Sequence, residues 1–245
     1  MRLWRGALIA CCAALFAGTS GATPPDIVTE ARFAEPTTRY DHGILGDAVE
    51  WGALVLTVDK CLGCEGKMIR QVTIRLPESR VFEDIAPRII VDEDTIPVVM
   101  VVESDLQRGA RLALYDGDGL RAATPFIGRA HRWLAPVGAG DLDGDGRVEI
   151  AYVDRPHLAK ILRIWRFEDG KLTHAADVPG LTNHRIGWDF IPGGIRDCGT
   201  GPEMITADAD WAHVMATRWD GQRATSRRLG GYDGPPSLNR ALACK

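Results

Sequence analysis

A short acidic loop, residues 140–149, holds the residues of this chain whose types and spacing best suit chemistry. It reads Gly-Asp-Leu-Asp-Gly-Asp-Gly-Arg-Val-Glu, and an apolar run follows at once. Its three carboxylates, from Asp141, Asp143 and Asp145, stand at alternate positions, and two glycines let the loop curl. Oxygen donors grouped in this way suit a hard cation such as Ca2+, with the Arg147 carbonyl and the Glu149 carboxylate completing the set. We therefore predict a calcium site.

The predicted ion is structural rather than catalytic. An EF-hand would need an acidic residue three positions after Glu149, where this chain has Tyr152, and a helix rather than a β-type run. All the ligands come from one tight loop, so the ion would order a turn and would have no evident water to activate. The alternative is a solvated acidic hairpin without metal, although three crowded aspartates repel one another in the absence of a cation.

The N-terminus has the charge and hydropathy order of a secretory signal peptide. Arg2 and Arg5 precede an apolar segment, and small residues lead to a predicted cleavage after Ala22. The apolar segment is too short for a bilayer span, which takes roughly 20 apolar residues, and no later run qualifies. We predict a periplasmic or secreted protein. Lipid attachment at Cys11 is the less favoured alternative.

The charge of the mature chain excludes some classes of partner. Loss of the two leader arginines leaves 27 of the 29 basic residues against 33 acids, a net charge of −6. A nucleic-acid or anionic-membrane surface would need a basic field, so neither partner is expected.

Four cysteines remain after cleavage, which in an exported chain indicates two disulfides. They are Cys61, Cys64, Cys198 and Cys244. Three pairings are possible. We favour Cys61–Cys64 and Cys198–Cys244, the second of which would fasten the C-terminus to the domain. A redox-active Cys61-Leu-Gly-Cys64 pair is the alternative, but such sites open a helix, and residues 68–76 alternate as a strand does.

The chain is self-similar over a period of about fifty residues. Each copy contains a β-rich run that ends in an acid, and Asp-Gly turns with a similar step lie between later runs. The run-ending acids are Asp59, Glu103, Asp154 and Asp208, which are 44, 51 and 54 residues apart. The repeats cover approximately 41–84, 85–128, 131–180 and 184–231 within one domain, 23–245.

This period predicts an all-β fold, a β-propeller of four blades with four strands each. A fifth blade assembled from both termini is an alternative, in which residues 27–40 return to the last blade and close the ring. A β-sandwich is the main rival, but it does not explain a fixed period.

The segment 140–153 resembles the FG-GAP or VCBS repeat, the blade unit of integrin-α-like propellers. In that family the acidic loop joins the first two strands of a blade and binds Ca2+. The resemblance implies ligands from Asp141, Asp143, Asp145 and Glu149 and from the Arg147 carbonyl. The match is specific in the third copy only. The second copy keeps acids near Asp92 without a glycine, and the fourth has a cysteine after Asp197.

No familiar catalytic motif is present, but two His-Arg pairs fall at the same place in successive copies. His131-Arg132 and His184-Arg185 each precede the first strand of a blade, with Asp41-His42 as a possible third instance. They could form one face that binds an anionic ligand. The alternative is that each blade uses them in the same internal contact. Trp188 and Trp211 also lack a repeat-level explanation and could face a carbohydrate or peptide.

We predict a non-enzymatic, calcium-stabilised, monomeric propeller that binds or scaffolds an unidentified protein or glycan. The alternative is an exported hydrolase or lyase with its site at the central channel. Mutually close His, Asp and Arg side chains at one mouth of the channel would favour the enzyme. A featureless channel beside an exposed aromatic patch would favour the binding module.

Overall fold

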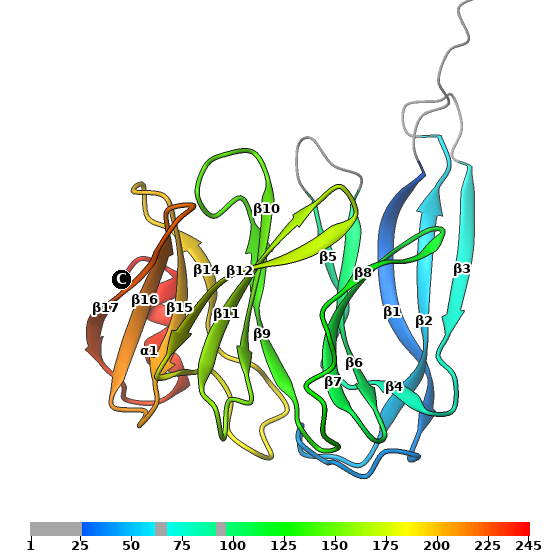
Figure 1. The fold of residues 1–245 in the computed structure, drawn as a ribbon, viewed down its shortest axis with the longest axis horizontal. Coiled ribbons are helices and arrows are strands. Elements are labelled where there is room, and N and C mark those ends of the chain that lie inside the picture. Colours follow the sequence, from blue (N-terminus) through cyan, green and yellow to red (C-terminus); the bar gives the residue numbers. More distant parts are fainter. Residues whose placement is uncertain (1–25, 62–67, 92–96) are drawn as a thin grey trace, which may run out of the picture.

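The computed structural model describes residues 26–61, 68–91 and 97–245, and antiparallel strands make up most of them (Figure 1). One short helix, α1 (Pro235–Leu242), follows the last strand. No helix in the described ranges is long and apolar enough to cross a membrane. The prediction of an all-β fold is confirmed. The predicted signal peptide, Cys64 and the acids near Asp92 lie outside the described residues.

The first sheet consists of two groups of strands linked by a short bridging strand, β4 (Arg80–Phe82), which pairs with both β2 and β6. In the first group β2 pairs with β1 and β3, and in the second β6 pairs with β5 and β7, which also pairs with β8. The bounds are β1 (Ile27–Thr37), β2 (Glu50–Asp59), β3 (Ile69–Arg75), β5 (Arg88–Ile90), β6 (Val98–Asp105), β7 (Gly109–Asp116) and β8 (Gly119–Ala123).

The rest of the chain forms two further antiparallel sheets. One has four strands in the order β12-β11-β10-β9, and the other has the order β13-β15-β16-β17, with β14 also paired to β15. The four-stranded sheet contains β9 (Leu134–Gly140), β10 (Val148–Asp154), β11 (Ile161–Glu168) and β12 (Lys171–Pro179). The last sheet contains β13 (Leu181–Thr182), β14 (Gly194–Asp197), β15 (Pro202–Asp208), β16 (His213–Trp219) and β17 (Ala224–Gly231).

Successive groups of strands pack face to face, because alternate residues of a strand point to opposite faces of its sheet. On β6, Met100 and Val102 belong to an apolar cluster shared with the β9–β12 sheet. Their neighbours Val99 and Val101 belong to a cluster shared with β1–β3. Burial on both faces explains why the central strands are continuous apolar runs.

The described sheets do not close into a ring. They stand in a row, with β3 at one end and β17 and α1 at the other (Figure 1). Leu238 and Ala241 of α1 cover the outer face of the last sheet. The predicted return of residues 27–40 to the last blade is wrong, since β1 pairs with β2. A helix that caps the end of a stack hides the apolar face that ring closure would otherwise bury.

The predicted disulfide between Cys198 and Cys244 is present, with a Cα–Cα distance of 5.8 Å. It ties the chain end that follows α1 to the connection between β14 and β15. The disulfide and the packing of α1 therefore hold the same cap in place.

Candidate functional site

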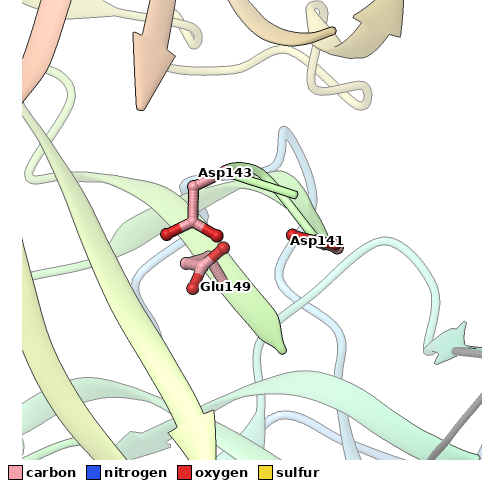
Figure 2. Close-up of side chains that lie close together, drawn as sticks. All are labelled: Asp141, Asp143 and Glu149. Carbon is pink, nitrogen blue, oxygen red and sulfur yellow. The ribbon is translucent and has the colours of Figure 1, made fainter. Parts of the chain in front are cut away.

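The acidic loop joins β9 to β10 and brings three of its predicted ligands together. One oxygen from each of Asp141, Asp143 and Glu149 lies within 4.8 Å of the others. Figure 2 shows the carboxylates of Asp143 and Glu149 directed toward each other, with Asp141 beside them. Glu149 is buried. The structure does not place Asp145 in this group.

The side chain of Arg166 supplies a positive charge to this loop. Arg166 lies on β11 directly opposite Glu149 on β10. Its Nη2 is 2.5 Å from Asp143 Oδ2, its Nη1 is 2.8 Å from Asp145 Oδ2, and its Nε is 2.8 Å from Glu149 Oε1. One guanidinium therefore binds three of the carboxylates that sequence reasoning assigned to Ca2+.

Backbone groups satisfy most of what remains. Asp141 accepts hydrogen bonds from the N–H groups of Gly144 and Gly146 at 2.7 and 3.0 Å. Burial opposes ionisation of Asp141, but these donors outweigh it and lower the pKa of its carboxyl. At Glu149 burial dominates and raises the pKa. The donor chemistry fits Ca2+, and Arg166 competes with that ion for Asp143 and Glu149.

A second cluster lies at the opposite end of β10, where the strand leads into the connection 155–160. There the connections between strands bring four histidines together in two contacting pairs, His42 with His131 and His157 with His184. His42, His131 and His157 line one cavity together with Arg132 and Arg155. The cavity measures about 30 Å³, enough for one ordered water molecule.

His42 is held by a buried carboxylate. Its Nδ1 lies 2.6 Å from Glu83 Oε1, and the hydroxyl of Ser104 donates to the other oxygen. The main-chain carbonyl of Glu83 accepts the indole N–H of Trp133 at 2.9 Å. Burial raises the pKa of Glu83, although His42 and Ser104 oppose the shift. Burial and the charge of Glu83 raise the pKa of neighbouring Glu50 to about 9, so Glu50 carries a proton at neutral pH.

The hydrogen-bonding pattern of His157 and His184 fixes where their protons lie. His184 Nε2 is 2.9 Å from the Trp188 carbonyl, which only accepts, so this nitrogen carries the proton. Burial lowers the pKa of His184, and its neutral ring therefore presents a lone pair at Nδ1. His157 Nε2 donates to that lone pair at 3.2 Å. Burial and the proximity of His184 lower the pKa of His157 to about 4, which leaves the lone pair of His157 on Nδ1.

Two residues that line the cavity, and Trp211 in the connection between β15 and β16, adopt a backbone conformation that side chains disfavour. His131, Arg155 and Trp211 have φ angles of 55°, 44° and 57°. The N–H of His131 donates to the Tyr40 hydroxyl at 2.9 Å, which holds this turn. Left-handed non-glycine residues are uncommon and gather at functional sites.

The structure places the predicted ligand face on one edge and divides it in two. His131 and Arg132 line the cavity, and His184 adjoins it through His157. Arg185 instead lies over the ring of Trp211, with its guanidinium carbon 4.8 Å from the ring centre. Sequence reasoning missed Glu83 and His157, because neither belongs to a motif or recurs between repeats.

Comparison with known proteins gives little. No protein-family model matches the chain, and no curated protein matches it significantly. Among solved structures it is similar to the calcium-free form of CoXyl43, a GH43 β-xylosidase/α-arabinofuranosidase from a compost microbial metagenome, in complex with xylotriose. The identity is 13%, the match covers 84% of this chain and 79% of that one, and the TM-score is 0.37.

These findings correct the prediction of a non-enzymatic binding or scaffolding module. The cavity brings together His and Arg side chains, which is part of the His, Asp and Arg cluster that would favour the enzymatic alternative. The described sheets form no central channel, so the site lies among the connections at one edge. At this TM-score no reaction and no residue role is carried over from the solved structure.

Proposed function

We propose that this protein is an exported hydrolase or lyase whose acid and base are histidines of the edge cavity. The observation that carries the proposal is the presence of two imidazoles with different environments in one cavity. His42 is bonded to buried Glu83, whereas burial keeps His157 neutral. Acid–base enzymes separate the two roles by giving similar groups different surroundings.

His157 is the proposed base. Its pKa of about 4 keeps it unprotonated at neutral pH, and the bond to His184 fixes its ring with the lone pair on Nδ1. The Trp188 carbonyl holds His184 in turn. In a hydrolysis Nδ1 takes a proton from a water molecule, and in a lyase reaction it takes one from carbon.

His42 is the proposed acid. Glu83 accepts its Nδ1 proton, which leaves Nε2 as the nitrogen that exchanges a proton with substrate, and the carboxylate balances the charge of the protonated ring. Arg132 donates to the His131 carbonyl at 2.9 Å and has no carboxylate partner among the described residues. Its charge can stabilise an anion that develops during the reaction. Arg155 is neutralised by Asp154, at 2.9 Å.

The test is an assay of the exported form, residues 23–245, on polysaccharides and oligosaccharides, with new reducing ends and unsaturated products measured separately. We expect His157→Gln and His42→Gln to lower kcat by about 100- to 10,000-fold. The matched control is His174→Gln, an exposed histidine on β12 paired with Asp177, which should keep full activity. Unchanged turnover in both cavity variants would contradict the proposal.

The proposal also covers the compartment, the architecture and the metal of the protein. The leader-like N-terminus and the Cys198–Cys244 disulfide support an oxidising compartment outside the cytoplasm. The four repeats are then blade-like units in an open row. Ca2+ would be held by Asp141, Asp143 and Glu149 and would supply charge that orders the loop. Arg166 would give up its contacts with Asp143 and Glu149.

A further inference from the structure

A group of aromatic side chains, the aromatic platform, lies beside the histidine cavity. It consists of Trp188, Phe190, Trp211 and Tyr232. The rings of Trp188 and Phe190 are stacked with centres 4.8 Å apart and planes 13° apart. Phe190 is 40% exposed and adjacent Ile186 is 70% exposed. Large apolar side chains exposed together mark a binding surface.

One arginine of the platform forms no ion pair with an acid in the described residues. The guanidinium of Arg185 lies over Trp211 at 4.8 Å and over Trp188 at 5.8 Å. Within the described part of the chain neither Arg185 nor Arg132 pairs with a carboxylate, whereas Arg166 binds three. A chain with a net charge of −4 thus leaves arginines unpaired beside its cavity.

The platform is joined to the cavity through the backbone. The main-chain carbonyl of Trp188 accepts a hydrogen bond from the Nε2–H of His184, and the other ring nitrogen of His184 is bonded to His157. Trp211 reaches the same surface from the connection between β15 and β16, in the left-handed conformation noted above. These hydrogen bonds therefore fix the platform beside His184 and His157.

We propose that the platform is the substrate subsite and that the substrate is an acidic glycan, with sugars that bear carboxylate or sulfate groups. This inference rests on the function proposed for the cavity. Phe190, stacked on Trp188 and 40% exposed, offers its outer apolar face to the C–H face of a sugar ring. Arg185 and Arg132 offer planar donors that match anionic oxygens. A neutral glycan would leave both charges unused.

The test measures binding by calorimetry in the His157→Gln variant, so that turnover does not consume the ligand. The probes are a linear oligouronide, the same oligomer after methyl esterification, a sulfated oligosaccharide and an oligoglutamate. We expect an anionic sugar to bind at least about tenfold more tightly than the ester, since a hydrogen bond to a charged group contributes about this factor. Arg185→Ala should reduce the preference, and Trp211→Ala should weaken binding of every sugar.

The matched control is Arg223→Ala, an exposed arginine in the turn between β16 and β17, which should bind as the parent does. Equal binding of the acid and its ester would overturn the inference, as would no binding of anionic sugars at millimolar concentration. Equal or tighter binding of oligoglutamate would also overturn it. Binding of acidic glycans without cleavage by the wild-type protein would leave the subsite standing and remove the proposed function. Cleavage of neutral glycans alone would support the proposed function and overturn the assignment of an acidic-glycan subsite.

Discussion

The two ends of β10 hold charged clusters of opposite character. At one end every carboxylate of the acidic loop has a partner: Arg166 binds three of them, and backbone N–H groups bind Asp141. At the other end His157 presents an unprotonated nitrogen, and Arg132 has only a carbonyl partner. A charged cluster whose partners all lie within its own sheet stabilises a turn. A cluster whose polar groups face a cavity without charged partners is suited to chemistry.

The comparison also separates local from long-range signals. The residues of the acidic loop are consecutive in the sequence, so the loop can be recognised from the sequence alone. The cavity is lined by residues 42, 131 and 157, which bond to residues 83 and 184 behind them, and different connections contribute all five. The more conspicuous motif is therefore the structural one in our assignment, and the dispersed residues carry the proposed reaction.

The largest expected effect comes from removing the charge that holds His42. Glu83→Gln keeps the size of the side chain but cannot balance a protonated His42. We expect kcat to fall by about 1,000-fold or more, by analogy with loss of the buried acid behind other catalytic histidines. The melting temperature of Glu83→Gln should change little.

The readout that separates positioning from general damage is the pH–rate profile, whose shape should change in Glu83→Gln. Glu78→Gln alters a glutamate whose side chain is 93% exposed, and it should leave the profile unchanged. A profile of unchanged shape in Glu83→Gln would show that the bond to His42 plays no part in turnover.

The next effect sharpens the other side of the comparison. Arg166→Ala removes the one side chain that binds Asp143, Asp145 and Glu149 together. Because it leaves buried Glu149 without its cation, we expect a loss of about 3 kcal/mol in the free energy of unfolding. Urea unfolding with and without millimolar Ca2+ measures it, and Ca2+ should restore more stability to the variant than it adds to the wild type.

Arg75→Ala, which breaks an exposed pair with Glu35, provides the control and should cost less than about 1 kcal/mol. The calcium prediction fails if millimolar Ca2+ changes neither the urea unfolding nor the melting temperature of the wild type and of Arg166→Ala. In that case Arg166 alone is the cation of the loop.

The sequence could predict what repeats or lies together and little else. The fifty-residue period predicted the strands and all-β class, and the even cysteine count allowed the Cys198–Cys244 bridge. The ring was predicted wrongly, because nothing in the pattern of residues 235–242 shows that α1 covers the last sheet. Glu83 and His157 were missed because their roles arise only where connections from different repeats meet. Arg166 was missed because its opposition to Glu149 depends on strand register.

The last prediction concerns the pH dependence of stability. Burial, followed by the charges of Glu83, Asp47 and Asp84, raises the pKa of Glu50 to about 9 in the folded state, from an ordinary value of about 4.5. Between these values the folded protein binds a proton that the unfolded chain releases, so stability falls as the pH rises from about 4.5 to 9. Urea midpoints across this range should decline in the wild type and flatten in Glu50→Gln, with Glu78→Gln declining like the wild type. An equal slope in Glu50→Gln would assign the pH dependence elsewhere. Burial also raises the pKa of Glu149 at the loop end of β10, so any slope that remains in Glu50→Gln measures the contribution of the other buried acids.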